Sequence, residues 1–146
     1  MYNGLLHAHS GLRWILLLLL VAAVVNALIK WQKSQAYTAG DRKIGLFAMV
    51  FTHLQLVLGL ILYFISPKVV FAAESMKVAA LRFFLVEHIT IMLIAVAVIT
   101  IGHVKVKKTL DDESKFKKTF IWFLTGLVLI LIGIPWPFYN YGAGWF

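Results

Sequence analysis

The sequence contains no cysteine, and only six of its 146 residues are acidic and three are proline. The absence of cysteine excludes disulfides, cysteine-ligated iron–sulfur clusters and thiolate zinc sites. No P-loop, GxGxxG or HExxH pattern occurs, and no nucleophile–base triad can be recognised. Hydrolase and nucleotide chemistry therefore have no support in the sequence.

Apolar side chains are in excess instead, at 62% of all residues. A soluble domain of this size cannot cover so much apolar surface. Apolar runs of about 18 residues are candidates for bilayer spans, and four such runs use up most of the sequence. They are residues 11–29, 44–65, 78–102 and 119–134. Short connections favour an up-down bundle, so we predict an all-α membrane protein in which residues 1–146 form one four-helix domain.

The basic residues predict the orientation of this bundle. Ten of the fourteen Lys and Arg residues lie in or beside the first and third connections, around residues 30–43 and 104–118. The positive-inside rule then puts both connections in the cytoplasm and both termini on the outer, periplasmic side of a bacterial inner membrane. Anionic lipid of the bilayer accounts for the net charge of +8 better than nucleic acid does. Residues 1–10 carry no Lys or Arg, so we expect a retained first span rather than a signal peptide.

Two histidines are expected at the middle of the bilayer. His53 lies ten residues beyond Lys43 and His88 lies eleven beyond Lys77, so each reaches about 15–16 Å into a core about 30 Å thick. Ionisable groups at that depth cost several kcal/mol unless they have partners, and so mark functional sites. Two imidazoles on antiparallel helices can hold the iron of one b-type haem from opposite sides.

Four other polar residues of the spans have candidate roles in binding this haem. Arg13 and Arg82 are candidates to receive its propionates on the outer side. Glu87 is a candidate to orient His53 through the second ring nitrogen, as carboxylates beside metal ligands do, and Gln55 is an alternative partner. The alternative is a purely structural role, in which histidine and glutamate only join helices by hydrogen bonds and Glu87 neutralises an arginine.

The remaining histidines give weaker indications. His88 and His103 are fifteen positions apart, near one face and about 22 Å from each other. That spacing resembles the paired histidines of two-haem cytochrome b helices. No histidine of another helix matches the depth of His103, so we expect one haem at most. His7 and His9 form an HxH pair that is a candidate for copper or zinc at the outer surface.

Several short motifs carry a resemblance that covers nearly the whole chain. They are Leu5-Leu-His-Ala-His-Ser-Gly-Leu-Arg-Trp14, Thr52-His-Leu-Gln55, Glu87-His88, Ile101-Gly-His103 and Ile134-Pro-Trp-Pro-Phe138. With these motifs the chain resembles a small bacterial family of four-helix membrane proteins labelled cytochrome b-like. The resemblance implies a haem protein.

The sequence therefore predicts a membrane b-type cytochrome-like protein, with one haem b and a role in electron transfer or as an accessory of a respiratory complex. A quinol or a respiratory-chain protein would exchange electrons with it. Two alternatives remain open: a cofactor-free assembly or interaction protein, and a small His/Glu-lined transporter of protons or metal ions. Four short helices bury little surface between themselves, which is compatible with an oligomer.

Overall fold

The structure, a computed structural model, describes residues 1–145, and all regular secondary structure in that part of the chain is helical. Four segments are long and apolar enough to cross a membrane, which confirms the predicted four-span, all-α fold. The helices are α1 (Tyr2–Gln32), α2 (Ala39–Ile65), α3 (Ala79–Arg82), a π-helical turn (Phe83–Glu87), α4 (His88–Lys108) and α5 (Asp112–Gly133). Short 3₁₀ turns occupy Ala73–Lys77 and Pro137–Tyr139.

The helices extend further into the charged segments than predicted. Thr38 and Asp41 form a reciprocal cap in which each side chain accepts from the other's backbone N–H, so α2 begins at Ala39 rather than near residue 44. Asp111 accepts from the backbone N–H of Ser114 at 2.8 Å and starts α5 seven residues before the expected residue 119. The predicted long loop over residues 104–118 is therefore mostly helix.

The N-terminal lead is also helical. Residues 1–10 were expected to precede the first span, yet α1 begins at Tyr2 and has 31 residues, which corresponds to about 46 Å of helix. No proline interrupts this stretch, and the polar side chains His7, His9 and Ser10 are compatible with a helix. The consequence is that His9 is fixed on a helix face instead of lying in a surface segment.

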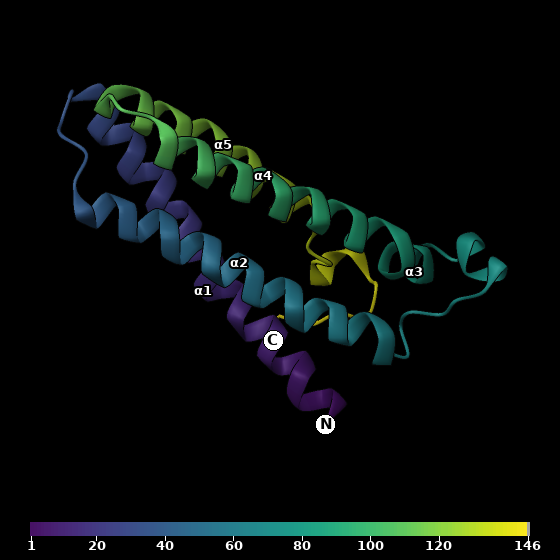
Figure 1. Cartoon of the computed structure of the whole chain (residues 1–146). Helices are drawn as coiled ribbons and strands as arrows, with labels where there is room; N and C mark the ends of the chain where they lie inside the picture. Colours follow the sequence, from purple (N-terminus) through teal and green to yellow (C-terminus); the bar gives the residue numbers. More distant parts are fainter. Residues whose placement is uncertain (146) are drawn as a thin grey trace.

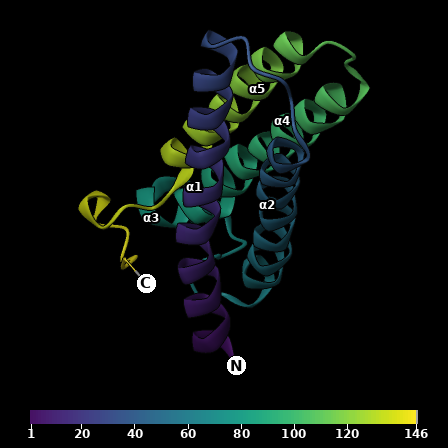
Figure 2. The ribbon, with the colours of Figure 1, turned by 90° about the vertical axis from the view of Figure 1, so that its left-hand side faces the viewer.

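The long helices form a bundle whose connections alternate between its two ends. Figure 1 shows the α1–α2 and α4–α5 connections at one end, which we call the basic end, and the α2–α3 connection at the other. α1 packs against both α2 and α5, α5 packs against α4, and the contact between α2 and α4 is the sparsest of these. The view in Figure 2 shows α1 in front of the crossing α4 and α5, with α2 beside it. After α5 the C-terminal tail, residues 134–145, leaves the bundle at the end opposite the basic end.

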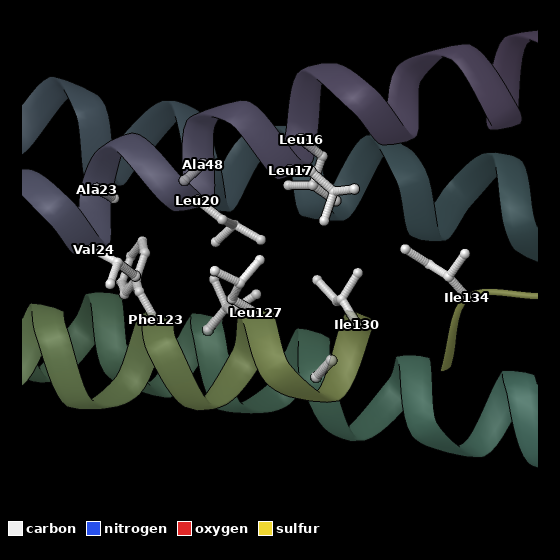
Figure 3. Packing of buried hydrophobic residues seen from close by; sticks show 12 residues of the cluster. Leu16, Leu17, Leu20, Ala23, Val24, Ala48, Phe123, Leu127, Ile130 and Ile134 are labelled. Carbon is white, nitrogen blue, oxygen red and sulfur yellow. The ribbon is translucent and has the colours of Figure 1, made fainter. Parts of the chain in front are cut away.

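The main core lies between α1 and α5. Leu16, Leu20 and Ala23 of α1 are at most 2% exposed, and Figure 3 shows this face of α1 directed at α5. From α5, Phe123 and Ile130 fill the space between the two helices. Large apolar side chains elsewhere point outward, as lipid-facing side chains of a membrane bundle do. The dry core occupies the α1–α5 side, so the sparse α2–α4 side is where a cavity can form.

Candidate functional site

A cavity opens among α1, α2 and the start of α4. Its volume is about 180 Å³, and its wall is mainly apolar. The polar residues on its wall come from α1, α2, the α2–α3 connection and α4, and they include Tyr2, His9, Ser10, Arg13, Thr52, Gln55, Ser66, Lys68 and His88. A mostly apolar hollow with a few converging polar groups is the usual form of a ligand site. This cavity is the candidate functional site.

His88 enters the cavity directly after the π-helical turn Phe83–Glu87. Its Nδ1 lies 2.7 Å from the carbonyl oxygen of Gly133, at the end of α5. A carbonyl oxygen only accepts, so Nδ1 carries the hydrogen, and the neutral ring keeps a lone pair on Nε2. A histidine that donates to a carbonyl from one nitrogen is oriented for metal ligation through the other.

His9 reaches the same cavity from α1. The carbonyl oxygen of His9 accepts from Gln55 Nε2 at 2.7 Å, which ties α1 to α2 at this level. Gly59 of α2 lies against the ring, because a Cβ placed there would be 3.2 Å from His9 Cε1. The buried Nδ1 of His9 has no hydrogen-bond partner among residues 1–145. Gly59 thus packs against the ring, while the ring nitrogen Nδ1 forms no hydrogen bond within residues 1–145.

The rings of His9 and His88 lie across from each other, with centroids 6.5 Å apart and planes at 78°. A ring centre lies about 1.1 Å from its nitrogen and a metal–nitrogen bond measures about 2.0–2.1 Å, so imidazoles on opposite sides of one metal have centres about 6.3 Å apart. The observed separation is close to that value. The residues present therefore fit an iron held between two imidazoles, although residues 1–145 contain no group of three or more His, Cys, Asp or Glu that could hold a metal ion.

Two further buried polar atoms beside the histidines have no hydrogen-bond partner in the described part of the chain. They are Nε of Arg13 and Oε1 of Gln55, both from cavity-lining residues. A buried polar atom without a hydrogen bond costs about 1–3 kcal/mol, so such atoms are uncommon in a finished core. Together with His9 Nδ1, they gather at this cavity three buried polar atoms that find no partner within residues 1–145.

His53 is not part of this site. Its Nδ1 lies 2.8 Å from the carbonyl oxygen of Met49 and its Nε2 lies 3.3 Å from the hydroxyl of Thr100. Thr100 is twelve residues from His88 along the same helix, which is about 18 Å of rise. The structure therefore does not bring His53 and His88 together, and the imidazole that lies across from His88 is that of His9. The depth argument fails because α2 begins at Ala39, four residues before Lys43, so the distance from Lys43 does not measure the depth of His53.

Arg82 and Glu87 are also placed away from the cavity. Arg82 Nε and Glu87 Oε1 form an ion pair of 2.7 Å, with side chains 42% and 39% exposed. Neither residue lines the cavity. The expected roles of Arg82 toward propionates and of Glu87 toward His53 are not what the structure shows, since each satisfies the other. Arg13 and Gln55, by contrast, do line the cavity.

The last two histidines are separate from each other and from the site. His7 is exposed while His9 is in the bundle, because residues two apart on a helix point to different sides, so the expected surface chelate does not form. His103 lies near the basic end, where its Nδ1 is 3.9 Å from a Cβ placed on Gly45. His103 therefore packs against α2 at the far end from the cavity.

Two parts of the site were missed at the sequence level. Lys68 and the tail residues Gly142, Ala143 and Gly144 line the cavity mouth, but nothing in their local sequence predicts that the tail folds back. The i, i+4 spacing of His9 and Arg13 did carry the information that both share one helix face. This inference requires residues 1–10 to be helical, which the polar side chains of that segment do not indicate.

The chain matches no family model, no curated protein and no solved structure.

Proposed function

We propose that this protein is a membrane haem protein in which His9 and His88 bind one b-type haem iron from opposite sides. The observation that carries the proposal is the 6.5 Å separation of the two ring centres inside an apolar cavity. When bound, the haem supplies one-electron chemistry between the ferrous and ferric states. This function is also the one that the cytochrome b-like resemblance implies.

Different residues in and beside the cavity would orient the iron ligand, supply a positive charge and surround the haem with apolar side chains. His88 is oriented by Gly133, and Arg13, whose Nε has no partner within residues 1–145, would offer a positive donor to the haem. The apolar wall, with Leu56, Met92 and Ile130 among its residues, excludes water from the macrocycle. The burial of the haem and the identity of its iron ligands are two of the factors that set its reduction potential.

We further propose that the protein transfers electrons in a bacterial inner membrane, exchanging them with a quinol or a respiratory-chain protein. Positive-inside reasoning places the basic end in the cytoplasm, and the cavity mouth then faces the periplasmic side. An electron donor or acceptor would approach there, near the tail and the α2–α3 connection.

The test is the absorption spectrum of the protein purified in detergent from haem-replete cells. We expect a Soret band that sharpens and shifts on reduction with dithionite in the wild-type protein. The band is expected to be lost in His9→Ala and in His88→Ala. His53→Ala and His103→Ala are matched controls, because these histidines lie outside the cavity, and both are expected to keep the band.

Circular dichroism of each variant separates loss of the site from loss of the fold. A colourless wild-type protein that also takes up no added haem would refute the haem proposal and favour the cofactor-free assembly protein. Loss of the band in His53→Ala, with unchanged helicity, would refute the assignment of His9 and His88.

A further inference from the structure

Two positive side chains at the cavity mouth are bound to the backbone of the C-terminal tail. Arg13 donates from an NH₂ nitrogen to the carbonyl oxygen of Trp145 at 2.7 Å, and Lys68 Nζ donates to the carbonyl oxygen of Gly142. Both residues line the cavity. The tail thus crosses the mouth and occupies both cations with neutral acceptors.

Within residues 1–145 neither cation has a carboxylate partner. The ion pairs within residues 1–145 join Lys30 to Asp41, Arg82 to Glu87 and Lys115 to Asp112. Burial lowers the pKa of Lys68, as expected for an ammonium group without a counter-ion. A hydrogen bond to an ionised acceptor is roughly twice as strong as one to a neutral acceptor. An anionic ligand group would therefore compete well against the tail carbonyls.

The tail combines small residues over the cavity with an aromatic end, since the Trp145 ring lies against those of Trp14 and Trp136. Asn140 and Gly142 both have positive φ angles, 57° and 70°, which turn the chain back over the mouth. Gly142, Ala143 and Gly144 have little side chain to anchor them in the cavity they line. Tyr141, whose ring centroid is 4.8 Å from that of Phe83, is the adjoining aromatic contact. Small residues over the mouth and an aromatic anchor beside it suit a cover.

The size of the cavity supports the same conclusion. With the tail in place the volume is about 180 Å³, whereas sites for ligands of drug or cofactor size usually measure about 300–1,000 Å³. The histidine pair fits a haem iron, but the enclosed space is small for the macrocycle. Movement of residues 142–145 would enlarge the cavity and would release the contacts of the Trp145 ring with Trp14 and Trp136.

We propose that Arg13 and Lys68 form a carboxylate-binding pair that receives the two propionates of the haem, and that tail residues 142–145 cover the empty site and leave both cations when the haem enters. This inference rests on the proposed haem function and adds the orientation of the ligand, with its propionates at the mouth. It assigns Lys68 and the tail, neither of which contacts the iron position, to ligand recognition.

The first experiment measures haem affinity by Soret titration for wild type, Lys68→Gln and the control Lys77→Gln. Lys77 is an exposed lysine of the same α2–α3 connection. Loss of one charge-assisted hydrogen bond is expected to weaken haem binding about tenfold in Lys68→Gln and not in Lys77→Gln. Haem dimethyl ester, which has no carboxylate, is expected to bind wild type and Lys68→Gln equally. An equal loss for both ligands, or no loss for haem, would overturn the proposal.

The second experiment follows the tail and uses the absence of cysteine from the chain. A single cysteine at Ala143, Ala143→Cys, is labelled with a maleimide before and after haem is added. We expect labelling to become several-fold faster with haem, while the exposed control Glu74→Cys keeps its rate. An unchanged or slower rate at position 143 would overturn displacement of the tail. A Soret spectrum identical to wild type is required, to exclude binding of the new thiol to iron.

The two proposals fail in different ways. If the wild-type protein binds neither haem nor its dimethyl ester, the proposed haem function is refuted. Propionate binding by Arg13 and Lys68 is then refuted as well. If it binds both with equal affinity and Lys68→Gln changes nothing, only the propionate pair and the cover are refuted.

Discussion

Gly59 of α2 lies against the imidazole of His9, such that a Cβ at position 59 would come within 3.2 Å of Cε1 and 3.8 Å of Nδ1. A contact of 3.2 Å is tighter than ordinary van der Waals contact. The glycine therefore allows the ring to lie between α1 and α2 and still face His88. This contact couples the packing of two membrane helices to the position of a candidate iron ligand.

Gly59→Ala is expected to lower haem affinity several-fold by moving the His9 ring a few tenths of an ångström. Alanine is favoured over glycine in a helix by about 1 kcal/mol, so thermal stability should not fall in parallel. Soret titration and the thermal midpoint measure the two effects separately. Gly4→Ala in α1 is the control, because a Cβ there meets nothing within 4 Å. Unchanged haem affinity in Gly59→Ala would contradict a role for the His9 ring.

The four spans and several of their ends could be predicted from the sequence because they depend on local properties. Long apolar runs specify membrane helices, and Ser66-Pro67 ends α2 at Ile65 because proline cannot continue the ladder. The same holds for the end of α5 at Gly133, shortly before Pro135. Hydropathy and proline act within a few residues, so one sequence is enough to read them.

The histidine pairing could not be predicted in the same way because it depends on register and rotation between helices. Counting from Lys43 and Lys77 puts His53 and His88 at one depth, but α2 begins before Lys43, at Ala39, whereas α3 begins after Lys77, at Ala79. The π-helical turn before His88 adds a further change of direction, since each extra residue in a turn rotates the following face by about 100°. Neither effect is visible in hydropathy.

Glu87→Gln is expected to leave the haem spectrum unchanged, although its neighbour His88 is a proposed ligand. The carboxylate pairs with Arg82 at 2.7 Å on a half-exposed surface, and exposed pairs contribute little to stability. The reduced-minus-oxidised spectrum and the thermal midpoint should both match wild type. Loss of the haem spectrum in Glu87→Gln, at normal helicity, would show that the Glu87 carboxylate takes part in haem binding.

Gly102→Ala is expected to be strongly destabilising through a different contact, between α4 and α5. The added Cβ would lie 2.3 Å from Cβ of Trp122 and 2.9 Å from its Cγ. Atoms so close to the backbone of α5 cannot move without moving that helix, and overpacking of this kind costs about 1–3 kcal/mol or more. The thermal midpoint in detergent measures the loss. Gly11→Ala, with nothing within 4 Å, is the control and should be neutral.

Asp41→Ala is expected to destabilise the α1–α2 hairpin by about 3 kcal/mol or more, because it breaks a buried ion pair and leaves the partners uncompensated. The carboxylate, whose side chain is 3% exposed, accepts from Lys30 Nζ at 2.8 Å and from Asn26 Nδ2 at 2.7 Å. Its second oxygen accepts the backbone N–H and the hydroxyl of Thr38, both at 2.7 Å. One side chain thus joins α1 to the cap of α2.

A double variant distinguishes the ion pair from simple packing at this position. Lys30→Met combined with Asp41→Leu removes both charges, and replacing a buried pair with apolar residues is often neutral. We therefore expect the double variant to be more stable than Asp41→Ala alone, as measured by thermal midpoints in detergent. If the double variant is no more stable than the single one, the loss comes from the cap of α2 and not from the unpaired Lys30.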